Sequence, residues 1–441
     1  MKYNNQEVVV IDIFCGCGGL STGLIQAGFK VGLAIDFEPK ACESYQINHP
    51  DTIVWNRDIA TVTGAEIRQV IGNAQIVLSG GPPCQSWSEY KVEINGSNKG
   101  LEDKRGQMIY EYLRIAEELQ PIAVIFENVP YMVKNPKHLI EFSKFKEKLH
   151  SRTGLSLEHK VLNAIDFGQA QQRERVIMIG TKDGISNPFD FLKNIKGPQT
   201  LRESLKGCPS SEYFHFKKND RDLMKFIKQG QCWNVLSPQM AFNHMKNDYK
   251  GICLDCNTSF QGINHCPKCQ STRIRNGYGI TSYLRRLSWD KPSPTICAVP
   301  TNKTHGLLAH PTEERCLSIR ECARVQGFPD DYVFVGTIFE QQRMIGNAVP
   351  TGLGKAIGIA LITALQQSSP KLDSQTDTVV RLLKYIVLHP ERFSLTELEK
   401  DYIRIVYKRY KTNQLTFPRK YVIYLKEIAT KLSVKTNNIA N

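Results

Sequence analysis

Short apolar runs alternate with amphipathic stretches along the first 180 residues of the chain. Runs of four to seven residues rich in Val and Ile predict buried strands, and the stretches between them predict helices. The expected strands are Val8–Phe14, Val31–Ile35, Ile76–Ser79, Ile122–Phe126, Lys160–Asn163 and Val176–Gly180. Strands and helices that follow one another in this way form βα units, so we expect an α/β fold with a doubly wound, mostly parallel sheet.

Two of the expected helices have recognisable ends. In Leu20–Ala27, Ser21 and Thr22 are candidate caps, and Gly28 is a typical stop signal. The helix Met108–Leu119 ends just before a proline, which cannot continue it.

The pattern changes after residue 180 and divides the rest of the chain. A stretch rich in Asn, Lys, Gly, Pro and Ser predicts a smaller irregular domain, after which regular patterning returns and ends in the apolar helix Gly352–Leu365, expected to pack on the first domain. A polar linker and an amphipathic, basic, helical extension follow. The predicted segments are 1–180, 181–283, 284–365, 366–378 and 379–441.

Composition narrows the class of protein. With 441 residues, 41% of them hydrophobic, the chain can form two or three domains with substantial cores, which excludes a disordered protein. The longest apolar run, Leu353–Leu365, has 13 residues and contains Lys355, so it is too short and too charged to span a bilayer. The N-terminus lacks the pattern of a signal peptide. We therefore expect no membrane association and an intracellular protein.

The charge and the cysteines point to partners without identifying them. The formal net charge is +14, from 57 basic and 43 acidic residues, which favours a polyanionic partner but is also common among soluble proteins. Residues 366–441 contain 14 Lys and Arg and 7 Asp and Glu, so half of the net charge lies there. Thirteen cysteines, an odd number in a large chain, fit thiols used for metal binding or catalysis better than disulfides.

A glycine-rich turn follows the first expected strand. The sequence DIFCGCGG, from Asp12 to Gly19, has glycines at 16, 18 and 19 that let the backbone approach a ligand and adopt positive φ, although such turns also serve packing. Its spacing is not that of the dinucleotide-binding GxGxxG motif, which argues against NAD. Asp36, after the second strand, can accept hydrogen bonds from ribose hydroxyls, and Asp58 from an adenine amino group; either acid alone is typical of a cap. Together they predict a pocket for an adenosine-containing cofactor without a pyrophosphate.

Reactive and charged side chains follow three further strands. Cys84 lies in the loop GGPPCQSWS, whose glycines and prolines favour a rigid conformation, and Glu127 ends the next strand. Arg173 and Arg175 immediately precede another strand. A buried thiol, a helix cap and a solvated ion pair would each explain one of them. Their expected convergence at one edge of the sheet instead predicts a reactive site.

These motifs, in this order, resemble the set that defines the DNA cytosine-5 methyltransferases. The match covers about residues 8–180 and 285–365 and consists of FCGCGG, GGPPCQSWS, FENV, QQRERV and GNAVP, supported by DKRG, SPTI and RVQGFPD. A series of this length in register is highly specific. The resemblance implies the class I fold of enzymes that use S-adenosylmethionine, with residues 181–283 as a target-recognition domain, and the bacterial restriction-modification type.

The resemblance also implies roles for individual residues. Cys84 would be the nucleophile, Glu127 the group that activates the pyrimidine ring, and Arg173 and Arg175 the supporting cations. The implied contacts to S-adenosylmethionine are Phe14, Gly16, Gly18, Gly19, Asp36, Phe37, Asp58, Ile59, Pro83, Met108 and Asn347. Residues 86–88 and 89–99 are candidates for a loop that closes on DNA.

The chemistry explains these residue types. Cytosine C5 attacks a methyl sulfonium poorly until a thiolate adds to C6, and sulfur is nucleophilic even when only partly ionised. Glu127 would draw electrons from the ring at N3 and Arg175 would bind the O2 side, which stabilises the charge of the transition state. Because the target atoms are stacked in a duplex, the cytosine must be flipped out.

Two Cys-x-x-Cys pairs lie in the irregular region. Cys253 and Cys256 are separated by nine residues from Cys266 and Cys269, an arrangement typical of one zinc ion held by four thiolates. His265 is an alternative ligand, and four unrelated reduced cysteines are the other explanation. We expect a structural zinc that replaces a missing hydrophobic core and orders neighbouring loops that carry Arg273, Arg275 and Arg285.

The sequence therefore predicts an enzyme that transfers a methyl group from S-adenosylmethionine to cytosine C5 in a specific double-stranded DNA site. We expect a cytoplasmic, nucleoid-associated monomer in a prokaryote that protects DNA from a cognate restriction endonuclease, without a stable complex between the two. A tRNA cytosine-5 methyltransferase and a non-catalytic DNA-binding relative are the alternatives. The first usually has a Cys-Phe-Thr triplet in the variable region, which is absent here. The extension at 379–441 could bind phosphates, bind a partner or cap the fold.

Overall fold

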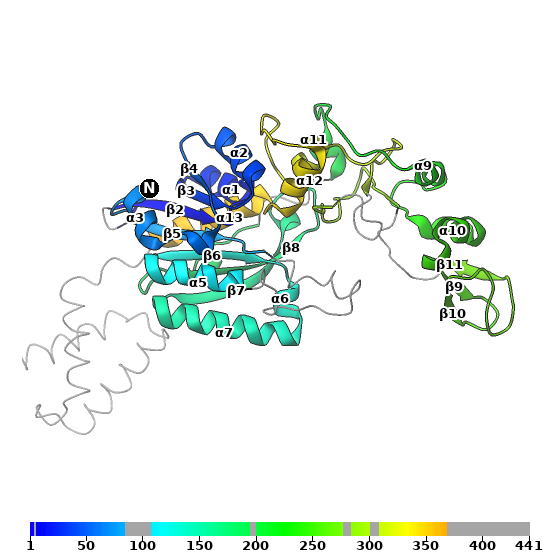
Figure 1. Ribbon diagram of the computed structural model, residues 1–441, viewed down its shortest axis with the longest axis horizontal. Helices are drawn as coiled ribbons and strands as arrows, with labels where there is room; N and C mark the ends of the chain where they lie inside the picture. The colour runs from blue at the N-terminus through cyan, green and yellow to red at the C-terminus, as the bar shows by residue number, and fades with distance from the viewer. Residues whose placement is uncertain (4–5, 84–106, 195–199, 277–283, 300–307, 368–441) are drawn as a thin grey trace, which may run out of the picture. The chain divides into compact units, whose positions relative to one another are not determined.

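The computed structural model describes residues 1–3, 6–83, 107–194, 200–276, 284–299 and 308–367. A mixed sheet is formed by strands from residues 2–181 in the order β4-β3-β2-β5-β6-β8-β7, with β1 paired to β2 outside this path (Figure 1). The strands are β1 (Lys2–Tyr3), β2 (Gln6–Ile13), β3 (Lys30–Asp36), β4 (Ile53–Asn56), β5 (Gln75–Gly80), β6 (Ala123–Asn128), β7 (Ser156–Asn163) and β8 (Glu174–Thr181). All six expected strands are present, with ends that differ by a few residues.

The sheet is parallel from β4 to β6 and antiparallel at β8 and β7. Alternate residues of the strands pack into different cores. Ile11 and Leu78 face one core with the helices α3 (Gly64–Ile71), α5 (Met108–Leu119) and α7 (Pro136–Thr153). Val10 and Val77 face the other with α1 (Gly19–Ala27) and α13 (Thr351–Gln366). Both faces of the sheet are covered by helices, which confirms the doubly wound α/β fold.

The helix α1 begins differently from the prediction. Its N-cap is Gly18, whose φ is 92°, and no side chain caps the helix. Ser21 donates to Asp12, and Thr22 donates to the carbonyl oxygen of Gly18. The two hydroxyls are therefore not caps, because the preceding turn already directs them to other acceptors, whereas the predicted stop at Gly28 is confirmed.

The apolar helix near residue 365 packs on the first region as expected. A Cβ atom on Gly23 of α1 would lie 2.5 Å from the backbone nitrogen of Lys355 in α13, so the two helices are in backbone contact. The stretch Ile338–Gln366 is long and apolar enough to cross a membrane by composition alone, but 67% of its most apolar window is buried within the protein. The same stretch is broken into α12 (Ile338–Asn347) and α13. Burial of this extent is typical of a helix in a protein core.

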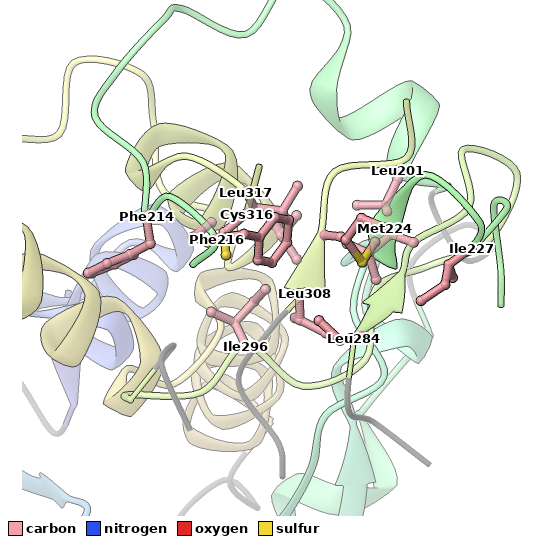
Figure 2. Close-up of a cluster of buried hydrophobic side chains, with 14 of the residues drawn as sticks. Leu201, Phe214, Phe216, Met224, Ile227, Leu284, Ile296, Leu308, Cys316 and Leu317 are labelled. Atoms are coloured by element: carbon pink, nitrogen blue, oxygen red, sulfur yellow. The ribbon is translucent and has the colours of Figure 1, made fainter. Parts of the chain in front are cut away.

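A third core lies among residues 201–345. It joins side chains such as Leu201, Met224 and Ile227 with Leu284 and Leu308, which come from the other side of the cysteine pairs in the sequence (Figure 2). The short elements around it are α8 (Leu201–Leu205), α9 (Lys218–Met224), α10 (Pro238–Met245), β9 (Lys250–Cys253), β10 (Ser259–Gln261), β11 (Ile274–Asn276), β12 (Arg285–Arg286), β13 (Leu308–Ala309) and α11 (Ile319–Val325). The expectation that this irregular region lacks a hydrophobic core is wrong, since apolar residues spread over more than a hundred positions meet there.

Some predicted features lie outside the described residues. They are Cys84, the candidate closing loop at 86–99 and the basic extension at 379–441.

Candidate functional site

Glu127 and Arg175 meet at one edge of the sheet because β8 is antiparallel to β6. In this register Glu127 is opposite Ile177, so the start of β8 lies beside the end of β6. Nε of Arg175 lies 2.8 Å from Oε1 of Glu127, and each side chain is only 12% exposed. A parallel β8 would have placed the residues before it at the opposite edge.

Two features of the environment of Glu127 have opposite effects on its protonation. Burial raises the pKa of this carboxyl above its usual value of 4.5, while the charges of Arg175 and Arg173 act in the opposite direction. The protonation of Glu127 therefore depends both on its burial and on the two guanidiniums.

The loop that carries Cys84 starts against Glu127. A Cβ atom on Gly81 would lie 2.7 Å from Oε2 of Glu127, so a larger residue there would displace this carboxylate. The side-chain amide of Asn128 donates to the carbonyl oxygen of Pro82 at 3.1 Å. Cys84 follows two residues later, outside the described part of the chain.

Arg173 differs from Arg175 in its contacts. It is 1% exposed and donates to the carbonyl oxygens of Ile296 and Gly346 at 2.9 and 2.7 Å. Its charge still lowers the pKa of Glu127. The two expected cations therefore lie near the same carboxyl, and Arg175 forms an ion pair with it.

The three glycines of the turn have different environments. Gly16 has a φ of 54°, and a Cβ atom there would meet nothing within 4 Å. At Gly18 a Cβ atom would lie 2.8 Å from the hydroxyl of Tyr332, and at Gly19 it would lie 2.5 Å from the carbonyl oxygen of Val349. Only Gly16 borders open space. Added side chains at Gly18 and Gly19 would overlap packed protein, so these two glycines also serve packing, and their expected contact with a cofactor stays a prediction.

Asp36 organises the open side of the turn. Its two carboxylate oxygens accept from the backbone amides of Gly16 at 2.8 Å and Glu38 at 2.9 Å. Burial raises the pKa of Asp36, and these two amides oppose the increase. The adjacent Phe37 is 64% exposed, an unusual exposure for a ring. A fixed carboxylate, an open glycine and an exposed ring fit the adenosine part of a cofactor.

The remaining candidate residues differ in their environments. Asp58 is exposed and accepts from the amide of Ala60, as a cap does, while Ile59 is buried. Phe14 has a φ of 58° and packs partly on the core that also contacts Met108. The segment after Asn347 touches Gly19 through Val349, so it reaches the glycine turn. Pro83 is half-buried at the last described position before Cys84.

Asp12 was not predicted as a site residue, and its hydrogen bonds stabilise the glycine turn. This carboxylate is 1% exposed and accepts from Ser21 at 2.5 Å and from Ser79 at 2.7 Å. It thereby joins β2, α1 and β5. Burial raises the pKa of Asp12 to about 6. The sequence could have identified Asp12, because it is an acidic residue within an otherwise apolar strand.

The four predicted metal ligands lie together, between β9 and β11. The sulfur atoms of Cys253, Cys256, Cys266 and Cys269 lie within 4.8 Å of one another, and three of the pairs are 3.4 to 3.5 Å apart. Tetrahedral zinc with Zn–S bonds of about 2.3 Å separates sulfurs by about 3.8 Å, so the cluster fits this ion. Among the described residues, His265 does not belong to the group.

Comparisons with known proteins agree with this geometry. Residues 8–363 match the model of the C-5 cytosine-specific DNA methylases. The chain is 32% identical over 368 residues to the type II methyltransferase M.Sau96I of Staphylococcus aureus, covering 82% of this chain and 77% of the relative. It is 30% identical over 377 residues to M.Eco47II of Escherichia coli, covering 83% and 81%.

A solved structure supports the fold. The methyltransferase EhMeth of Entamoeba histolytica superposes with a TM-score of 0.55 at 14% identity, covering 82% of this chain and 99% of that one. The family match extends over the glycine turn, the Glu127 edge and the segment that contacts Arg173. This chain belongs to the C-5 cytosine-specific DNA methylases.

Proposed function

We propose that this enzyme methylates C5 of a flipped cytosine in a specific double-stranded DNA sequence through a covalent bond between Cys84 and C6. The observation that carries the proposal is the buried pair of Glu127 and Arg175 beside the start of the Cys84 loop. DNA cytosine methylation itself follows from the family.

In the proposed reaction the Cys84 thiolate adds to C6, and the electron pair of the C5–C6 bond becomes available at C5. Glu127 hydrogen-bonds to N3, and Arg175 holds both Glu127 and the O2 side of the ring, so charge on the ring is stabilised as it develops. S-adenosylmethionine, held beside the glycine turn, would supply the methyl group that C5 takes and would depart as its thioether. A base removes the C5 proton, and the returning electron pair expels Cys84.

We assign S-adenosylmethionine to the space beside the glycine turn. Gly16 and Phe14 would border it, Asp36 would accept from the ribose and Phe37 would contact the adenine. Gly18 and Gly19 would hold the turn by packing. The remaining assigned contacts are Asp58, Ile59, Pro83, Met108 and Asn347. The open face of Gly16 and the exposed ring of Phe37 support this assignment.

We assign one structural zinc ion to Cys253, Cys256, Cys266 and Cys269. The cluster connects β9 to the segment before β11: the backbone amide of Leu254 donates to the carbonyl oxygen of Arg273 at 2.8 Å. Zinc would hold this segment in place within a target-recognition region at residues 181–283.

The proposal includes a biological context. The type II relatives suggest protection of DNA from a cognate restriction endonuclease that acts on the same site. We place the enzyme in the cytoplasm as a monomer, divided at the boundaries predicted above, with residues 379–441 as a basic extension.

Bisulfite sequencing of DNA incubated with the protein and S-adenosylmethionine tests this function. We expect conversion-resistant cytosines within one short sequence, and no resistance with Cys84→Ala, which should still bind DNA. Methylation by Cys84→Ala would remove Cys84 from its role. Methylation of tRNA in place of DNA would favour the RNA-modifying alternative, and DNA binding without methylation would favour a non-catalytic relative.

A further inference from the structure

The guanidinium of Arg173 bridges two backbone segments that are far apart in sequence. Nη1 donates to the carbonyl oxygen of Ile296 at 2.9 Å, and Nη2 donates to that of Gly346 at 2.7 Å. The two segments are in direct contact, because a Cβ atom on Gly346 would overlap the backbone of Cys297 and Ala298. Arg173 therefore holds the turn at the end of α12 against the segment that contains Ile296.

A second buried side chain holds the same turn from another direction. Nε2 of Gln326 donates to the carbonyl oxygens of Ile345 at 2.5 Å and Ala348 at 3.3 Å. The amide oxygen of Gln326 accepts from Gln171 at 2.8 Å, and Gln171 in turn accepts from the backbone amide of Ile296 at 2.8 Å. Side chains from outside this turn thus hydrogen-bond to three of its backbone carbonyl oxygens, those of Ile345, Gly346 and Ala348.

Asn347 lies between these fixed carbonyls, and its side chain is exposed. Arg173 is two residues from Arg175, which pairs with Glu127. We propose that Arg173 is a positioning residue that presents Asn347 to S-adenosylmethionine, so that one buried side chain links the cofactor pocket to the edge where the base reacts. This inference rests on the proposed function, in which Asn347 contacts the cofactor.

A double-mutant cycle between Arg173 and Asn347 tests the inference. Arg173→Lys keeps the charge near Glu127 but replaces the planar fork by a compact ammonium group. Asn347→Ala changes an exposed side chain. We expect each substitution to weaken binding of S-adenosylhomocysteine about ten-fold in calorimetry, and the double variant to bind about as weakly as Asn347→Ala alone. Arg173→Lys should raise KM for S-adenosylmethionine by a larger factor than it lowers kcat, since the charge near Glu127 remains.

Gln326→Leu provides an independent test, because it removes hydrogen bonds to the same turn without changing the charge. This variant also keeps the inference testable if Arg173→Lys does not fold. Gln341→Ala is the matched control: Gln341 lies on α12 but donates to Gly336 at the other end of the helix. It should bind S-adenosylhomocysteine like the wild type. Wild-type binding by Arg173→Lys and Gln326→Leu, or effects additive with Asn347→Ala, would overturn the inference. Failure of the wild type to methylate DNA would instead overturn the proposed function.

Discussion

Nε of Arg175 lies 2.8 Å from Oε1 of Glu127, at an edge of the sheet where both side chains are nearly buried. Burial favours the neutral carboxyl and raises the pKa of Glu127, whereas the adjacent guanidinium favours the carboxylate. The protonation of Glu127 thus depends on whether Arg175 is present, and this dependence can be measured.

We expect Arg175→Met to shift the pH dependence of methyl transfer upward. Without the guanidinium the pKa of Glu127 rises further, so the protonated form persists to higher pH. If the protonated form assists the ring at N3, the alkaline decline of kcat should move to higher pH, while kcat itself falls about ten-fold or more. Single-turnover methylation at a series of pH values measures both.

Glu127→Gln is the control for this shift. It has no carboxyl to titrate, so adding Arg175→Met to it should leave the position of the alkaline limb unchanged. An equal shift in both backgrounds would show that another group titrates, and an unshifted profile in Arg175→Met alone would contradict the coupling.

The sequence pattern predicted the sheet because its strands are buried on both faces and appear as apolar runs. It also predicted that Glu127 and Arg175 share an edge, but the reason lies in the antiparallel direction of β8, which no local pattern encodes. Strand direction is determined by the path of the whole chain.

Other features depend on contacts between segments distant in sequence. The glycines at 16 and 18 look alike along the chain, yet one borders open space and the other packs on Tyr332. Arg173 and Arg175 belong to one motif, yet Arg173 bonds to backbone that follows it by more than a hundred residues. Such partners become visible only once the chain is folded.

The two glycines should respond differently to alanine. Gly16→Ala should cost about 1–2 kcal/mol of folding stability from its positive φ and greatly weaken cofactor binding, because the new methyl group enters the open side of the turn. Gly18→Ala adds overlap with Tyr332 and should cost about 3 kcal/mol or more. Urea unfolding and calorimetry with S-adenosylhomocysteine measure the two effects. Equal stability of the variants would contradict the packing role of Gly18.

The buried carboxyl of Asp12 should make stability depend on pH. Its pKa is raised to about 6 in the folded protein, against about 3.9 in an unfolded chain. Between these values the folded state binds more protons, so this group adds stability as the pH falls. From pH 7 to pH 4.5 the wild type should gain about 2 kcal/mol relative to Asp12→Asn. Urea titrations of both proteins measure this, and parallel pH curves would show that Asp12 does not contribute.

Removal of metal should affect the cysteine cluster before the cofactor pocket. Purified protein should contain one zinc per chain, and Cys253→Ser should lower DNA affinity while binding of S-adenosylhomocysteine is retained, because the thiolates lie on β9 and its neighbours and none of the residues assigned to the cofactor is among them. Cys208→Ser, a half-buried thiol outside the cluster, is the matched control and should change neither. Protein without zinc, or unchanged DNA binding after all four cysteines of the cluster are replaced by serine, would refute the metal site.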